Sequence, residues 1–135
     1  MAVTAASIYK GNDGRMWYDL AADTTLDATY SGLVLNVTAT GKTLTLPATA
    51  VGLVFTVRNG GVADTDAATG SAYDGSVTVN VSPNAADKIS GNGFTATDDK
   101  DAINTLGDIG DEITLVADGS LGWYVVNVKG TWARE

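Results

Sequence analysis

The chain has 135 residues and a formal net charge of −8, from 16 Asp and Glu against 8 Lys and Arg, and this length fits a single domain. The negative charge disfavours binding to nucleic-acid phosphates and to anionic lipid, so we expect no nucleic-acid partner and no membrane partner. Because the sequence has no Cys and no His, it excludes disulfides, thiol nucleophiles and imidazole bases within one chain.

The first segment, residues 1–20, mixes apolar residues with the turn sequence KGNDGR. We expect it to be an extended N-terminal arm that includes the first short strand, followed by a single β domain over residues 21–135. The segment lacks the apolar core that a secretion signal needs, and no later run is long enough to span a bilayer. The sequence therefore predicts a protein that is made soluble in a cytosol.

Alternating apolar residues predict most of the remaining strands. The side chains expected to face the core are Leu33, Leu35 and Val37, then Leu44 and Leu46, then Leu53, Phe55 and Val57, then Val77, Val79 and Val81, and finally Ile113, Leu115 and Ala117. The run GWYVVNV, residues 122–128, is apolar on both faces, which is typical of a strand packed on two sides. Asp98–Gly107 has weak helix signals, so we expect at most one short helix.

This pattern predicts an all-β fold. With several short strands and glycine-rich turns, the expected architecture is a small antiparallel β-sandwich, jelly-roll-like, or a barrel. The longest connection, Asn59–Gly75, contains little strand pattern and is acidic. Connections of this length in compact domains are commonly functional or disordered.

The triplet Gly41-Lys42-Thr43 ends the phosphate-binding loop of nucleotide hydrolases. That loop needs another glycine at the position held here by Asn36, and a helix after the triplet. Here the triplet is followed by LTLP, which is a strand pattern ending in Pro47. We therefore interpret Gly41 and Lys42 as a hairpin turn between two strands.

Two acidic runs offer oxygen ligands for Ca²⁺, but neither has the spacing of an EF-hand loop; they are Asp98, Asp99 and Asp101, and Asp108, Asp111 and Glu112. We expect solvated acidic loops, no metal and no cofactor. No carboxylate pair stands out as a glycosidase pair, so an Asp-based hydrolase remains only a minor alternative.

The order of the segments GKTLTLP, GLVFTVRNGG, VTVNVSPNAADKISGNG and GDEITLVADGSLGWYVVNVKGTW resembles a β module of tailed-bacteriophage structural proteins. The module occurs in capsid decoration (cement) proteins and in head-fibre and tail-fibre tips, and the resemblance covers about Leu33–Trp132. It implies a homotrimeric, non-enzymatic virion protein that is made in the host cytoplasm. It would bind the outside of the capsid and stabilise the shell by bridging major capsid subunits. The alternative that it leaves open is the receptor- or carbohydrate-binding tip of a fibre.

Candidate contact residues follow from this resemblance and from the aromatic residues near the chain ends. For the capsid, we expect contacts from the arm and from the acidic loop, at Ile8, Tyr9, Lys10, Trp17 and Tyr18, and at Asp64, Asp66 and Asp74. For the trimer interface, we expect Trp132 with Trp123 and Tyr124 behind it. Ordinary surface or core positions are the alternative for each set.

Overall fold

The computed structural model describes residues 7–11, 13–63, 73–74, 77–97, 99–105 and 107–135. Asp64 and Asp66 of the acidic loop lie outside the described residues, as does Asp98. The strands are β1 (Tyr9–Lys10), β2 (Met16–Leu20), β3 (Thr24–Thr25), β4 (Val34–Val37), β5 (Lys42–Thr45), β6 (Val54–Asn59), β7 (Val62–Ala63), β8 (Tyr73–Asp74), β9 (Val79–Ser82), β10 (Lys88–Ser90), β11 (Ala102–Asn104), β12 (Glu112–Ala117), β13 (Gly122–Lys129) and β14 (Ala133–Arg134).

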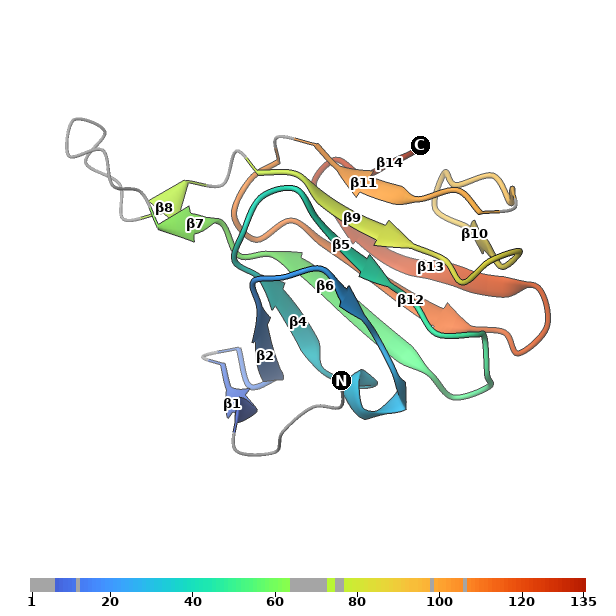
Figure 1. The fold of residues 1–135 in the computed structure, drawn as a ribbon, viewed down its shortest axis with the longest axis horizontal. Helices are drawn as coiled ribbons and strands as arrows, with labels where there is room; N and C mark the ends of the chain where they lie inside the picture. Colours follow the sequence, from blue (N-terminus) through green and yellow to red (C-terminus); the bar gives the residue numbers. More distant parts are fainter. Residues whose placement is uncertain (1–6, 12, 64–72, 75–76, 98, 106) are drawn as a thin grey trace.

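Two packed sheets form a small β-sandwich, which confirms the all-β prediction (Figure 1). The seven-stranded sheet has the order β1-β2-β4-β6-β12-β13-β10, and the five-stranded sheet has the order β14-β11-β9-β5-β3. A separate ribbon of β7 and β8 extends from one end of the sandwich (Figure 1).

The sheets are mixed rather than antiparallel. The pairs β2–β4, β4–β6, β3–β5, β5–β9 and β10–β13 are parallel. The reason lies in the connections: the chain passes from β4 in one sheet to β5 in the other and returns to β6 beside β4. The strands before and after such a crossover run in the same direction, whereas two strands joined directly by a hairpin are antiparallel.

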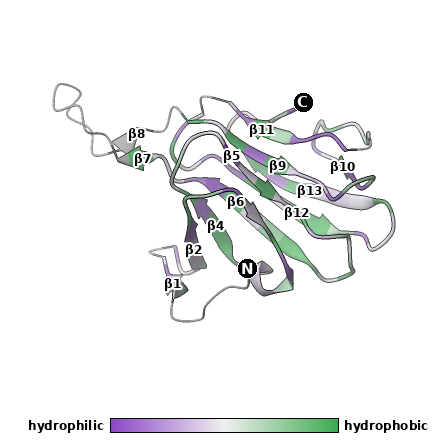
Figure 2. Ribbon diagram, in the orientation of Figure 1, coloured by the Kyte–Doolittle hydropathy of each residue, from purple (hydrophilic) through white to green (hydrophobic). Residues whose placement is uncertain are grey.

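The predicted inward side chains form the core between the sheets. Leu35, Leu44, Phe55, Val79 and Leu115 are fully buried, and Figure 2 shows hydrophobic colour along the central strands. The other predicted positions are also buried, except Leu53 and Ala117, which are partly buried against the core. Burial of side chains of this size contributes roughly 1.5–3 kcal/mol each to folding.

The turn interpretation of Gly41 is confirmed, but the hairpin prediction is wrong. Gly41 has a φ of +69°, and β5 starts at the next residue. However, β4 and β5 belong to different sheets, and the Gly41 N–H donates to the Thr78 carbonyl at 2.8 Å. The turn therefore carries the chain across the sandwich.

The helix predicted within Asp98–Gly107 is also wrong, because residues 102–104 form strand β11. Ala102 lies opposite Val81 of β9 and Arg134 of β14, so a partner strand lies on each side of β11. Pairing within the sheet outweighs the weak local helix signals. A 3₁₀ turn lies at Ala28–Tyr30, and Asp27 caps it by accepting from the Thr29 N–H. Accordingly, the described part of the chain holds no helix of the length and apolarity needed to cross a membrane.

Strand β13 is packed on one side only, contrary to the prediction of two-sided packing. Trp123 and Val125 are buried, while Tyr124 is 47% exposed and Val126 is 54% exposed. In the seven-stranded sheet, β13 lies between β12 and β10, and its outer face has no covering layer among the described strands.

A buried polar network joins the two sheets at one end of the sandwich. Asn59 of β6 donates through Nδ2 to Oδ1 of Asn104 of β11 at 3.1 Å. Asn104 donates in turn to Asp111 Oδ2 and to the Thr131 carbonyl, both at 2.9 Å. Gly130 has a φ of +82° and lies against the Asp111 carboxyl group. A Cβ added to this glycine would be 2.1 Å from that group. The network therefore requires glycine at this position.

Candidate functional site

Strands β1 and β2 form an edge of the seven-stranded sheet. Strand β1 pairs antiparallel with β2, with Tyr9 opposite Trp17 and Lys10 opposite Met16, and β2 pairs parallel with β4. The turn between β1 and β2 is closed by the Gly11 N–H, which donates to the Arg15 carbonyl at 2.8 Å. The segment expected to be an arm with one short strand thus contributes two strands to the sandwich.

A row of polar side chains crosses the outer face of this sheet. The register aligns Asp19 of β2, Asn36 of β4, Arg58 of β6, Glu112 of β12 and Lys129 of β13. Each residue lies directly opposite the next, because the outward positions of adjacent strands coincide in this register. Charged side chains from four strands and the Asn36 amide are thereby gathered in one line.

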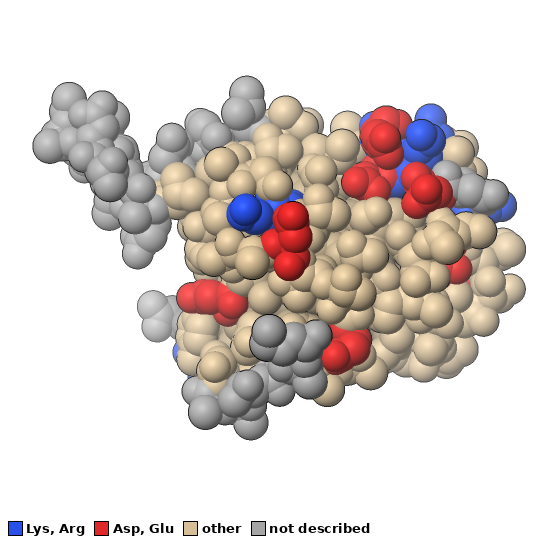
Figure 3. Space-filling model, in the orientation of Figure 1, with Lys and Arg blue, Asp and Glu red and all other residues tan. Residues whose placement is uncertain are grey.

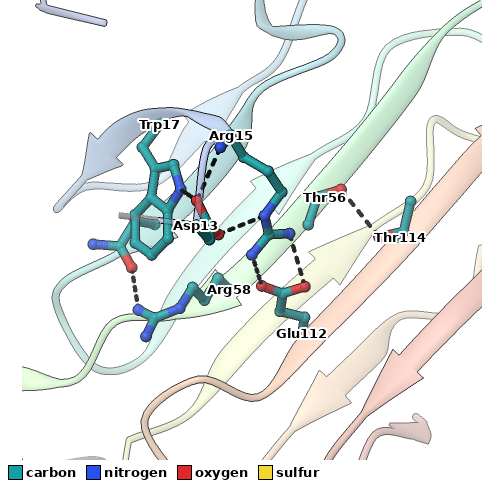
Figure 4. A network of polar contacts seen from close by, with 8 residues as sticks. Asp13, Arg15, Trp17, Thr56, Arg58, Glu112 and Thr114 are labelled. Carbon is teal, nitrogen blue, oxygen red and sulfur yellow. Dashed lines mark hydrogen bonds and ion pairs between the residues drawn. The ribbon is translucent and has the colours of Figure 1, made fainter. Parts of the chain in front are cut away.

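Glu112 is held by the guanidinium of Arg15 (Figure 4). Arg15 donates from Nη1 and Nη2 to the two carboxylate oxygens, at 3.0 and 2.6 Å. Its Nε donates to Asp13 Oδ2 at 2.6 Å, while Asp13 Oδ1 accepts from the indole N–H of Trp17 at 3.0 Å. These contacts tie the β1–β2 turn to β12 across the sheet.

Arg58 is held in a different way, against an aromatic ring. Its guanidinium carbon lies 4.7 Å from the centre of the Trp17 ring, and its Nη1 donates to Asn36 Oδ1 at 2.7 Å (Figure 4). Asn36 Nδ2 donates to Asp19 Oδ1 at 3.0 Å, so the amide stands between Arg58 and that carboxylate. In the described part of the chain, Arg58 therefore forms no direct ion pair with a carboxylate.

An open cleft of about 680 Å³ lies over this network. Four of the chain's eight basic residues line it, namely Lys10, Arg15, Arg58 and Lys129, together with Tyr9, Gly11, Asp13, Trp17, Gly110 and Glu112. Four cations against two carboxylates give the lining an excess of positive charge in a chain whose net charge is negative. On the face of the molecule shown in Figure 3, by contrast, charged side chains stand in small groups separated by uncharged surface.

Two titratable groups at the cleft have shifted pKa values. The backbone N–H of Arg15, the Arg15 guanidinium and the Trp17 indole lower the pKa of Asp13 to about 2. Partial burial, together with the hydrogen bond from its hydroxyl to Asp19 Oδ1 at 2.6 Å, raises the pKa of Tyr9 to about 12. At neutral pH, Asp13 is therefore charged and the Tyr9 hydroxyl remains a hydrogen-bond donor.

The structure brings together three of the residues predicted for capsid contact. Tyr9, Lys10 and Trp17 line the cleft, whereas Ile8 and Tyr18 pack against the core. Of the acidic-loop residues, Asp74 lies in β8, and the other two lie outside the described residues.

Of the three residues predicted for the trimer interface, two are buried and one is exposed. Trp123 and Trp132 are 1% and 8% exposed and belong to the core of their own chain. Tyr124 has an exposed side chain on the outer face of β13. The position of the trimer interface stays a prediction.

Sequence reasoning missed Arg15, Arg58 and Lys129 as site residues, and it considered Glu112 only as a ligand for Ca²⁺. The alternation of β6 indicated that Arg58 points outward, and Glu112 is one of only two Glu in the chain. What the pattern did not contain was the order of the strands, which brings these four residues into one site.

Two of the carboxylates considered for Ca²⁺ are engaged in other contacts. Asp111 accepts from Asn104, and Glu112 is paired with Arg15. In the residues that the structure describes, no group of three or more acidic side chains is close enough to hold a metal ion.

Comparisons of the chain with protein-family models, curated proteins and solved structures find no match.

Proposed function

We propose that the protein is a structural virion protein that binds the outside of a phage capsid as a trimer and stabilises the shell by bridging major capsid subunits. The proposal rests on the sequence resemblance of residues 33–132 to the phage β module. A ligand that binds only the assembled shell stabilises that shell by mass action, so many modest contacts suffice and no catalytic group is needed.

The observation that supports a docking role is the cleft at the β1–β2 edge. The cleft collects Tyr9, Lys10 and Trp17, which were predicted as contact residues from the sequence, on one open surface. Aromatic residues and Arg are the side chains that protein interfaces favour, and here Trp17 and Arg58 are already packed against each other. The partner on this side would be the major capsid protein.

Self-association is assigned to the exposed outer side of β13. Tyr124 and Val126 are about half exposed there, and Leu121 in the preceding turn is 61% exposed. Exposed apolar residues grouped on one strand favour a protein partner, which in this proposal is a second copy of the chain.

The test is sedimentation of the purified protein with expanded capsids and with unexpanded procapsids of the phage that encodes it. The expected result is saturable co-sedimentation with expanded capsids and a rise in their thermal stability. The double variant Tyr9→Ala/Lys10→Ala should remain folded, since both side chains are exposed, and should bind more weakly. The proposal is wrong if the folded wild-type protein leaves expanded capsids undecorated.

The alternative function is a receptor- or carbohydrate-binding fibre tip. The observation that favours it is the presence of Trp17 and Tyr9 beside basic side chains in the same cleft, with ring centres 6.2 Å apart. A glycan array separates the two functions, because a capsid-binding protein should give no signal on it, whereas a fibre tip should bind a defined sugar.

A further inference from the structure

The positive charge of the cleft is unevenly compensated. Arg15 is neutralised by Asp13 and Glu112, which are the two carboxylates in the lining. Arg58, Lys129 and Lys10 have no ion pair within 4.0 Å in the part of the chain that the structure describes. Three cations of the cleft are thus left without a direct carboxylate partner.

Two of these cations face the same point. Arg58 Nη2 and Lys129 Nζ lie 3.7 and 3.8 Å from the position that a Cβ on Gly110 would occupy. Both residues lie opposite Glu112 in the sheet register, but Arg15 already binds both oxygens of that carboxylate. Both cations therefore reach Gly110, and an anion placed beside this glycine would be attracted by both of them.

The Arg58 guanidinium is positioned before any ligand binds. The Trp17 ring and the Asn36 amide fix its plane, and Nη1 uses only part of its donor capacity on Asn36. A guanidinium fixed in this way loses little side-chain entropy when it takes up a carboxylate.

The chemistry of the surroundings favours a peptide carboxylate over a nucleic-acid phosphate. The chain's net charge of −8 opposes the approach of a polyanion, whereas a short acidic segment needs only the local field of the cleft. Strand β1 ends the order of the seven-stranded sheet and lines the same cleft, so its outer edge offers backbone groups to an extended segment.

We infer that this cleft binds an acidic segment of the partner protein, with a Glu or Asp carboxylate of that segment between Arg58 and Lys129. The inference deepens the proposed function and rests on it for the nature of the partner, which is a protein surface. It assigns the partner an exposed, negatively charged and extended stretch of chain.

The experiment is calorimetric titration of the full chain with a capped hexapeptide of alternating glycine and glutamate. The matched peptide has glutamine in place of glutamate. We expect the glutamate peptide to bind and the glutamine peptide to bind at least about tenfold more weakly, since hydrogen bonds to charged groups are roughly twice as strong as neutral ones. Affinity should fall as NaCl rises from about 50 to about 300 mM.

Matched charge variants separate the site from overall charge. Arg58→Gln/Lys129→Gln should lose at least about tenfold in affinity for the glutamate peptide. Lys42→Gln/Lys100→Gln removes the same charge at positions outside the cleft and should stay within about twofold. If Arg58→Gln/Lys129→Gln unfolds, two measurements replace it. One is titration of the exposed single variant Lys129→Gln, and the other is the NMR chemical shift of the Trp17 indole N–H in the wild-type protein as the glutamate peptide is added.

Three results would overturn the inference. They are equal binding of the glutamate peptide by the two double variants, no binding of the glutamate peptide by the wild-type protein, and tighter binding of inorganic phosphate than of the peptide. The proposed function has a separate readout in capsid co-sedimentation. Capsid binding without peptide binding contradicts only the carboxylate site, and peptide binding without capsid binding contradicts only the capsid partner.

Discussion

Glu112 is the residue on which the charge arrangement of the cleft depends. Its side chain is 10% exposed and makes both hydrogen bonds to Arg15, whose side chain is 43% exposed. Because Arg15 also holds Asp13, one carboxylate ties both Arg15 and Asp13 to β12. Without it, Arg58 and Lys129 of the two adjoining strands would lose the carboxylate between them, and Asp13 would be the one carboxylate left among the described residues that line the cleft.

The variant Glu112→Gln tests this role. It removes the charge but keeps the shape, so we expect the free energy of unfolding to fall by about 1–2 kcal/mol in urea denaturation. The exposed Asp108→Asn is the control and should change it by less than about 0.5 kcal/mol. An equal effect of the two variants would show that the ion pair contributes nothing.

Tyr9 provides a prediction at alkaline pH. Its pKa of about 12 in the folded protein lies above its ordinary value of 10.0, so the neutral hydroxyl is favoured by folding. The associated stability is fully present below about pH 10 and is lost as the pH rises through about 12. Difference absorbance of tyrosinate between the wild type and Tyr9→Phe should report this pKa. In Asp19→Asn the pKa of Tyr9 should move down, and an unchanged value would contradict the role of Asp19.

At the scale of the elements, local patterns predicted which side chains face the core but not which strands are neighbours. The alternation in β6 and β9 follows from burial on one face, and the buried positions Phe55, Val57, Val79 and Val81 confirm it. Strand β11 was mistaken for a helix because its three residues acquire strand character only between β9 and β14. The hairpin at Gly41 was wrong for the same reason, since the choice of sheet is a tertiary property.

The buried network at Asn104 should be one of the strongest links between the sheets. Asn104→Leu keeps a similar size but leaves Asn59 and Asp111 without their partner, so we expect a loss of about 2–4 kcal/mol in the free energy of unfolding. Asn127→Leu, on the exposed side of β13, should change it by less than about 0.5 kcal/mol. A similarly small effect at Asn104 would mean that water replaces the network at no cost.

At the scale of the whole molecule, the candidate site arises from topology. Arg15, Arg58, Glu112 and Lys129 are distant in the sequence and meet because β2, β4, β6, β12 and β13 are successive strands of one sheet. Tyr9, Lys10 and Trp17 were predicted from the sequence as capsid-contact residues and lie together in the cleft, while the contact itself stays a prediction. The other basic residues of the cleft could not be predicted, since their meeting depends on the register of four strand pairs.

The proposed trimer makes a prediction about mass in solution. Light scattering should give a mass close to three times the 13.8 kDa of one chain. Tyr124→Glu/Val126→Glu should reduce it to one chain while the circular dichroism spectrum stays unchanged, because both side chains are exposed. A wild-type protein that runs as a monomer at all concentrations would contradict the assignment of β13 as the self-association surface.

Binding of the protein to the outside of the capsid as a trimer is tested most directly by a cryo-electron microscopy reconstruction of expanded capsids incubated with the purified protein. We expect trimeric density on the outer surface of the shell, with the β1–β2 edge and its basic cleft against an acidic stretch of the major capsid protein. The proposal would be contradicted if capsids stay bare at a saturating concentration of the protein. It would also be contradicted if the protein binds through another face and leaves the cleft open to solvent.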